Sequence, residues 1–148
     1  MAFLIRTLLG FLLALAAALA LAADARFMAL SYHEVLADDE PLTPTAVRAS
    51  DLARQFAWLR ANDFHPVSVD QILAARDGGP TLPPNAILLT FDDGFKDAYT
   101  RVFPLLKLFG YPAVIALVGQ WMDVPEDQMV DYDGKPVPRS KFLTWGQV

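Results

Sequence analysis

The sequence predicts an α/β domain built around a parallel sheet. Apolar runs at 26–32, 86–91 and 112–118 have the length and residue types of buried strands. Helical patterns at 50–62 and 98–109 lie between these strands, and such alternation is typical of parallel α/β folds. In these folds functional residues lie at the carboxyl ends of strands, and the first two of these runs are followed by polar residues.

Composition limits the classes of protein that need to be considered. The chain has 148 residues, of which 54% are hydrophobic, and this is enough to bury the core of one domain. The formal net charge is −5 and basic residues do not cluster, so no nucleic acid partner is expected. The absence of cysteine excludes disulfides, thiolate catalysis, zinc sites built from cysteine and a cysteine-linked lipid anchor.

Residues 1–23 have the layout of a secretory signal peptide. Arg6 precedes an unbroken apolar run from Leu8 to Ala23, and small residues at its end suit cleavage. An uncleaved N-terminal membrane anchor is the alternative, because the run is nearly long enough to span a bilayer. We expect the remaining domain to occupy residues 26–148.

The domain is expected to begin with a strand, which is followed by a loop and a helix. The strand over 26–32 is expected to be buried and to end at His33, before a polar loop over 37–45. Ser50 is the expected N-cap of a helix that ends near Asn62. The residues at helical spacing that should face the core are Leu52, Phe56 and Leu59.

The middle of the chain carries further short elements. A β-stretch is expected within 64–69, where Ser68 is placed to cap a short helix. The helix over 98–109 should stop at Gly110, because glycine readily adopts the left-handed conformation that often follows the last helical residue. Pro104 should kink this helix or delay its start.

Residues 122–141 are polar and interrupt the α/β pattern. Asp133 and Gly134 between two short arms predict a β-hairpin. Residues 142–148 have the pattern of a helix start with Thr144 as N-cap. Because no closing element follows, we expect the domain to be truncated.

Asp92 and Asp93 are the strongest candidates for chemistry. They follow an apolar strand and precede Gly94, which allows the chain to turn there. Adjacent carboxylates repel each other, so the pair favours a shared proton or a bound cation. In a hydrolase one carboxylate can ligate a divalent ion while its neighbour takes a proton from the attacking water. The alternative is an Asp-Asp-Gly turn that only closes the strand.

The segment Thr90-Phe-Asp-Asp-Gly94 resembles the first motif of the polysaccharide deacetylases, carbohydrate esterase family 4. The resemblance covers nearly all of the chain after the leader, including the expected hairpin. Segments similar to the PgaB-type poly-β-1,6-N-acetyl-D-glucosamine N-deacetylases of biofilm export lie at 28–35, 55–62, 99–106 and 112–114. The resemblance implies an incomplete (β/α) barrel of the polysaccharide deacetylase (NodB-like) type.

The resemblance also implies roles for three residues. Asp92 would be the catalytic base, and His33 would be the general acid of a permuted motif. Asp93 would ligate a divalent metal ion of the zinc, nickel, iron or cobalt type. The implied reaction is metal-dependent hydrolysis of N-acetyl groups from an N-acetylglucosamine polymer. For His33 the alternative is a strand-end histidine that hydrogen-bonds a neighbouring carboxylate.

The implied setting is the periplasm, reached by secretion across the inner membrane, with association with the outer membrane. The implied partners are an N-acetylglucosamine polysaccharide and an outer-membrane export protein. Two other functions stay open: a non-catalytic carbohydrate-binding or scaffold module of an export complex, and a peptidoglycan or chitin deacetylase.

The sequence departs from the family pattern in one respect. The family completes its metal site with two histidines downstream of Asp-Asp-Gly, whereas no histidine follows His65 here. Because a catalytic metal normally has three protein ligands, we attribute the gap to truncation and expect the fragment alone to be inactive.

The other aromatic residues and His65 carry less weight. Trp58, Phe103 and Phe109 have helical spacings that predict core positions. Trp121 is a candidate for a rim position where a sugar ring would stack. His65 is expected in a surface loop without a functional role.

Overall fold

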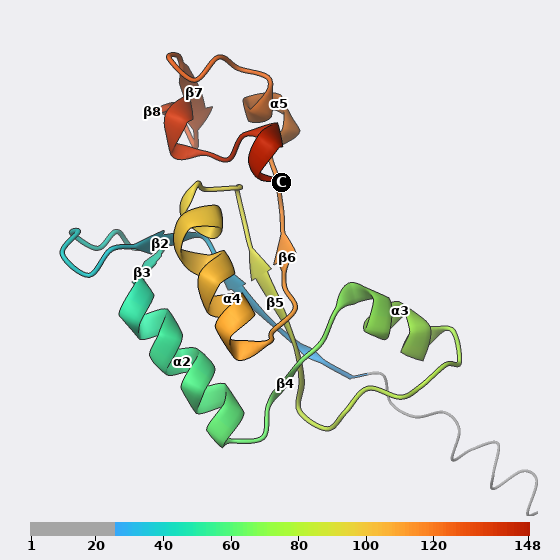
Figure 1. The fold of residues 1–148 in the computed structure, drawn as a ribbon. Helices are drawn as coiled ribbons and strands as arrows, with labels where there is room; N and C mark the ends of the chain where they lie inside the picture. The colour runs from blue at the N-terminus through green and yellow to red at the C-terminus, as the bar shows by residue number, and fades with distance from the viewer. Residues whose placement is uncertain (1–25) are drawn as a thin grey trace, which may run out of the picture.

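The computed structural model describes residues 26–148, which form an α/β architecture (Figure 1). The predicted leader, residues 1–23, lies outside the described residues and stays a prediction. Within the part that is described, no helix is long and apolar enough to cross a membrane.

A parallel sheet of four strands forms the centre of the domain. β5 (Ala86–Phe91) pairs with β1 (Met28–Tyr32) along its length, from Met28 opposite Ile87 to Tyr32 opposite Phe91. β4 (His65–Pro66) pairs with the start of β5, and β6 (Val114–Ile115) pairs with its end. The strand predicted at 86–91 is therefore confirmed as the middle strand.

Two helices cover one face of this sheet. They are α2 (Ala49–Ala61) and the helix made of the π-helical η1 (Ala98–Val102) and α4 (Phe103–Phe109) (Figure 1). The main core lies between these helices and β5, and burial of each large side chain there stabilises the fold by about 1.5–3 kcal/mol. Its largest buried members are Leu52, Phe56, Leu59, Ile87, Leu89 and Phe91.

The helix boundaries follow local chemistry. The predicted break at Pro104 is confirmed, because the helix changes from π to α there and the proline takes a first-turn position that needs no N–H. Gly110 ends the helix with φ of 69°, as predicted. The predicted cap at Ser50 is wrong. The N-cap is Arg48, and the Asp38 side chain accepts the Ser50 N–H at 3.2 Å.

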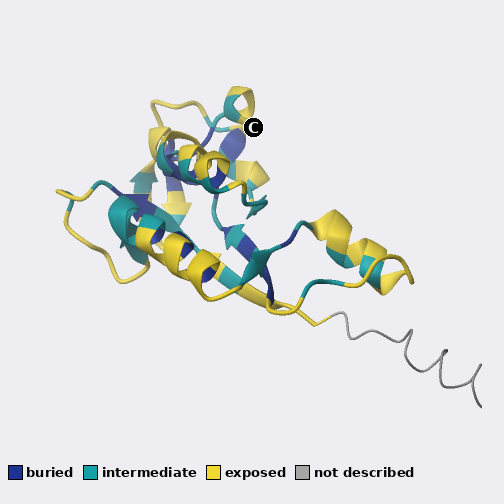
Figure 2. Ribbon diagram, turned by 60° about the horizontal axis from the view of Figure 1, so that its bottom comes forward, coloured by how far each residue is buried: buried dark blue, intermediate teal, exposed yellow. Residues whose placement is uncertain are grey.

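The chain between β1 and α2 contains two strands that were not predicted. β2 (Glu34–Leu36) and β3 (Ala46–Arg48) pair in parallel on either side of the loop over 37–45. In contrast, the helix α3 (Val69–Arg76) begins at the predicted cap, where Ser68 and Gln71 form a capping box. Figure 2 shows α3 exposed along most of its length, and it has no buried residue.

Residues 119–147 form a small unit beyond the carboxyl ends of β5 and β6 (Figure 1). The predicted hairpin is confirmed, since Asp133 and Gly134 adopt φ of 53° and 76° between its strands. Thr144 caps a 3₁₀ turn, as expected for the start of a helix. The elements are α5 (Gly119–Met122), β7 (Met129–Tyr132), β8 (Lys135–Pro138), η2 (Arg139–Lys141) and η3 (Trp145–Gln147).

Some burial predictions are wrong. Met28 in β1 is 50% exposed, because β1 has only one neighbouring strand in the described sheet. The run at 112–118 forms only the two-residue β6, which is half-buried. Trp58 and Phe103 are 57% and 50% exposed, and Phe103 faces an open groove beside β6 rather than the packed core. Phe109 does pack against the core, edge-on to Phe56.

Arg139 is the largest fully buried side chain and holds the 119–147 unit together. It is 1% exposed, and its guanidinium donates to the backbone carbonyls of Met122, Phe142 and Leu143 at 3.3, 3.1 and 2.7 Å. Removing a guanidinium from this position would leave buried carbonyls without donors, which is more costly than losing an exposed charge.

We predict that Arg139→Met lowers the free energy of unfolding by about 3 kcal/mol, because several buried acceptors lose their partner. Urea unfolding of the complete gene product, followed by circular dichroism, measures this change. Arg54→Met is the matched control, since Arg54 is exposed and forms a surface ion pair with Asp51. Its effect should stay within about 0.5 kcal/mol. Equal effects of both substitutions would contradict the prediction.

Candidate active site

His33, Asp92 and Asp93 lie at one edge of the sheet. His33 directly follows β1 and the two aspartates directly follow β5, and parallel strands place these carboxyl ends together. The Asp92 N–H donates to the Tyr32 carbonyl at 2.7 Å and so extends the strand pairing to the site. His33 Nε2 lies 4.0 Å from Asp93 Oδ2. The structure thus brings the predicted general acid beside the predicted metal ligand.

The backbone turns sharply at Asp93 and Gly94, which have φ of 68° and 65°. An aspartate tolerates the left-handed region better than most residues, but the conformation still carries strain. At Gly94 there is a second constraint, since a Cβ would come within 2.9 Å of the Leu117 side chain. The turn separates the two carboxylates, so that each has its own partners.

Asp92 is held by β1. The Ser31 hydroxyl donates a short hydrogen bond to Asp92 Oδ2. Ser31 and His33 are two residues apart, and alternation along an extended chain places them on the same side. The resemblance to the family implied no role for Ser31. The feature of the sequence that could have identified Ser31 is its position two residues before His33.

Tyr132 is a site residue that was not predicted from the sequence. It lies in β7, and its hydroxyl donates to Asp93 Oδ2 at 2.9 Å. Phe95 packs against its ring edge-on, with the ring centroids 5.5 Å apart. Burial, together with the hydrogen bond to Asp93, raises the pKa of Tyr132 to about 12. Tyr132 therefore keeps its proton and remains a hydrogen-bond donor to Asp93.

Asp97 is a second residue that was missed, and it is 7% exposed. Its Oδ2 accepts the Val35 N–H at 2.9 Å, while Oδ1 has no hydrogen-bond partner among the described residues. Burial raises the pKa of Asp97 to about 7, and the neighbouring Glu34 and Glu40 act in the same direction. The Val35 N–H and Arg101 oppose this rise.

The described residues do not complete a metal site. Asp93 offers a carboxylate suited to a divalent ion, and its Oδ2 faces the His33 imidazole. However, residues 26–148 contain no group of three histidine, cysteine, aspartate or glutamate side chains placed to hold a metal. The donor set of these residues therefore fits only part of a metal site.

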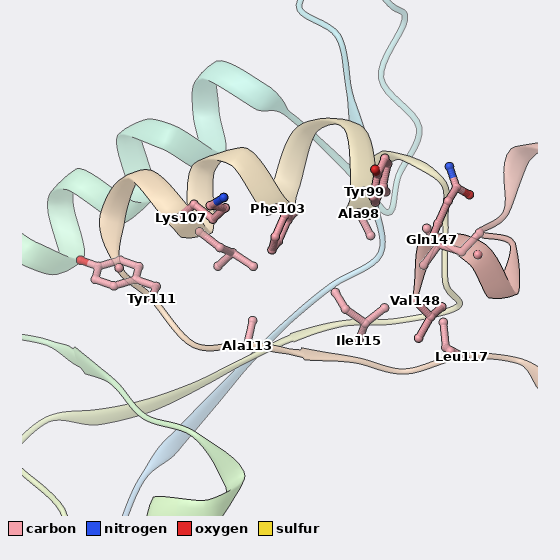
Figure 3. A pocket seen from close by; sticks show the side chains of 14 residues that line it. Ala98, Tyr99, Phe103, Lys107, Tyr111, Ala113, Ile115, Leu117, Gln147 and Val148 are labelled. Carbon is pink, nitrogen blue, oxygen red and sulfur yellow. The ribbon is translucent and has the colours of Figure 1, made fainter.

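One cavity is lined without any of the acidic side chains that the structure describes. It is an open groove of about 670 Å³ between α4, β6 and the last residues of the chain (Figure 3). Phe103, Tyr111, Ile115 and Leu117 contribute to its lining, which includes no carboxylate side chain and no imidazole from the described residues. His33, Asp92 and Asp93 are not among the residues that line this groove.

Two predictions about neighbouring residues have different outcomes. His65 lies in β4 opposite Ala86, at the far end of β5 from Asp92, and pairs with Asp63 at 3.2 Å. It is therefore a strand residue outside the site, rather than the loop residue that was expected. Trp121 packs against Tyr132 and Phe142, and its role as a sugar platform stays a prediction.

Comparison with known proteins agrees with this geometry. Residues 79–135 match the family model for polysaccharide deacetylase. Over 122 residues, or 82% of this chain, the sequence is 48% identical to poly-beta-1,6-N-acetyl-D-glucosamine N-deacetylase of Escherichia coli K12. The chain belongs to the polysaccharide deacetylase family. It spans 18% of the length of that Escherichia coli relative.

Solved structures of the family confirm the predicted fold. A de-N-acetylase from Aggregatibacter actinomycetemcomitans has a TM-score of 0.75 at 37% identity and matches 82% of this chain. The BpsB deacetylase domain from Bordetella bronchiseptica has a TM-score of 0.68 at 40% identity and matches 84%. This chain covers 48% and 50% of those two structures. The described residues are thus part of a polysaccharide deacetylase barrel.

The raised pKa of Asp97 predicts a pH dependence of stability. The folded state holds this proton more tightly than the unfolded state, whose pKa is near 3.8. The stabilisation is therefore complete below about pH 4 and is lost as the pH rises through 7. Because Asp97→Asn removes the titration, its free energy of unfolding relative to wild type should rise over this interval.

Urea unfolding at several pH values measures this difference, whose slope has an upper limit of about 1.4 kcal/mol per pH unit. Asp70→Asn is the control, since Asp70 is exposed in the first turn of α3. A difference between Asp97→Asn and wild type that does not change with pH would contradict the prediction.

Proposed function

We propose that this protein hydrolyses N-acetyl groups of poly-β-1,6-N-acetyl-D-glucosamine. The observation that carries the proposal is the meeting of His33 with the Asp92–Asp93 turn at the carboxyl edge of β1 and β5. The 48% identity to a protein named for this activity supports the same substrate. The products would be acetate and a polymer that carries free amines.

Asp92 and His33 would each carry out one proton transfer of the reaction. Asp92, oriented by Ser31, would take a proton from the attacking water, whose oxygen forms a bond to the amide carbon. The carbon–nitrogen bond then breaks, and His33 would protonate the departing amine. His33 is suited to this step because its side chain is 38% exposed and adjacent to Asp93. One carboxylate and one imidazole thus serve as base and acid.

We propose a divalent cation as the cofactor, with Asp93 as the ligand that these residues contribute. Such an ion, when bound, supplies positive charge that polarises the attacked carbonyl group. Tyr132 would fix the Asp93 carboxylate in place, since second partners of this kind orient ligands. The identity of the metal is left to experiment.

The cellular setting is also a proposal. Cleavage of residues 1–23 would release the protein in the periplasm, where it would act on polymer during export. An outer-membrane export protein would be its partner there. The apolar run from Leu8 to Ala23 supports secretion, and the names of the relatives support the polymer.

The decisive experiment measures acetate release by the complete gene product from poly-β-1,6-N-acetyl-D-glucosamine, with added divalent metal and with chelator. Metal-dependent release from this polymer supports the proposal. Equal or greater release from chitin oligomers or peptidoglycan would assign a different deacetylase substrate. Polymer binding without any release would instead favour the non-catalytic carbohydrate-binding module.

We predict that Asp92→Asn lowers kcat by at least about 100-fold, because an amide cannot act as the general base. Acetate release at saturating polymer measures this loss. Metal content should stay at the wild-type level, since Asp92 is held by Ser31 and is not the proposed ligand. Asp70→Asn is the control for the substitution itself. Wild-type turnover of Asp92→Asn would refute its role as base.

We predict that Asp93→Ala weakens metal binding by at least about 10-fold, because one carboxylate ligand is lost. Equilibrium dialysis against the metal, with detection by atomic absorption, measures affinity independently of activity. Tyr132→Phe should weaken binding less, since the carboxylate remains and loses only one hydrogen bond. Unchanged affinity of Asp93→Ala would remove Asp93 from the metal site.

A further inference from the structure

Two backbone ties enclose His33. Just before it, the Tyr32 carbonyl accepts the Asp92 N–H at 2.7 Å. Just after it, the Val35 N–H donates to Asp97 Oδ2 at 2.9 Å. Both ties run to the segment from Asp92 to Asp97, which also carries Asp93. The imidazole therefore sits on a short stretch that is fixed at each end to the chain of the carboxylates.

The second tie is part of a larger, partly buried arrangement. Arg101 lies four residues after Asp97 in the same helical segment, and its guanidinium donates to the Val35 carbonyl at 3.4 Å. Both backbone polar groups of Val35, a fully buried residue, are thereby held from one segment. Arg101 also pairs with Glu40 at 2.8 Å, and the Glu40 carboxylate accepts the Ala37 N–H at 2.9 Å.

We propose that Asp97 is a positioning residue for His33: by holding the Val35 backbone, it sets the place of the imidazole beside Asp93. The proposal rests on the proposed function, in which His33 protonates the amine. Asp97 is too deeply buried to touch a polymer, so it acts only through the chain that it holds. Arg101 supports the same residue by donating to the Val35 carbonyl.

The chemistry of the tie explains which substitutions should matter. An asparagine keeps an acceptor oxygen for the Val35 N–H, whereas an alanine leaves that buried N–H without a partner. Displacement of a catalytic group by about 1 Å can cost a factor of about 100 in rate. Asp97→Ala should therefore impair the step that needs His33, and Asp97→Asn should restore it.

The test compares two substrates of the complete gene product. Hydrolysis of the amide in poly-β-1,6-N-acetyl-D-glucosamine needs a proton for the departing amine, whereas an aryl acetate ester expels a phenolate without one. Asp97→Ala and His33→Gln should both lower kcat for the polymer by about 100-fold and leave ester hydrolysis nearly intact. The double variant should be no slower than His33→Gln alone, because both changes remove the same function.

Three results would overturn the proposal. They are an equal loss of ester and amide hydrolysis in Asp97→Ala, unchanged amide hydrolysis in that variant, or a further multiplicative loss in the double variant. Leu59→Ala is the matched control for lost stability, because it opens the core on α2 and removes no tie to His33. Its effects on the two substrates should be equal.

An activity-independent measurement separates this proposal from the function on which it rests. Imidazole resonances of His33, assigned with His33→Gln, are compared by NMR at one fixed pH in wild type and in Asp97→Ala. The chemical shifts of His33 should differ between the two proteins, while those of His65 should not. If wild type hydrolyses neither substrate, the proposed function fails, and unchanged His33 chemical shifts would then overturn the positioning role as well.

Discussion

The parallel register between β1 and β5 is the constraint on which the whole site depends. It places Tyr32 opposite Phe91, so the residues that follow each strand meet at one edge of the sheet. A slip by one residue would move Ser31 and His33 to the opposite face. The core prevents that slip, because Leu89 and Phe91 are buried beneath α2 and α4 and fix the face that β5 presents. The position of His33 relative to the carboxylates is thus determined by hydrophobic packing, and the polar contacts refine it.

The turn at Asp93 is held from outside the sheet. A non-glycine residue at φ of 68° costs of order 1 kcal/mol or more, and such a conformation persists only where its surroundings determine it. In this structure, the surroundings that fix Asp93 are provided by the 119–147 unit. The Leu143 N–H donates to the Gly94 carbonyl at 2.8 Å, and Tyr132 donates to Asp93 itself. Two residues after Gly94, the Lys96 N–H donates a hydrogen bond to the Lys141 carbonyl at 2.8 Å. The 119–147 unit, which interrupts the α/β pattern, therefore holds the carboxylate turn through contacts from Tyr132, Lys141 and Leu143.

The parts of this fold that were predictable depend on short stretches of sequence. The capping box at Ser68, the stop at Gly110 and the hairpin turn at Asp133 each need only a few neighbouring residues. The same holds for the Asp92–Asp93 turn after a strand. Tyr132 and Asp97 escaped prediction because their partners are 39 and 62 residues away in the chain. Helical spacing identified one face of each helix, but it could not show whether a neighbour covers Trp58 or Phe103.

Two buried ionisable side chains brace the segments around the site, and neither has a buried counter-charge as its main partner. Asp97 binds a backbone N–H, and Arg139 binds three backbone carbonyls. Burying a charge is unfavourable, and apolar residues of similar size often give a more stable fold. Apolar side chains, however, cannot fix the direction of a peptide group. Asp97 holds the chain after His33, and Arg139 holds the return from the hairpin to Phe142 and Leu143. The domain thus accepts a cost in stability where the backbone must be fixed to keep His33, Asp92 and Asp93 in their relative positions.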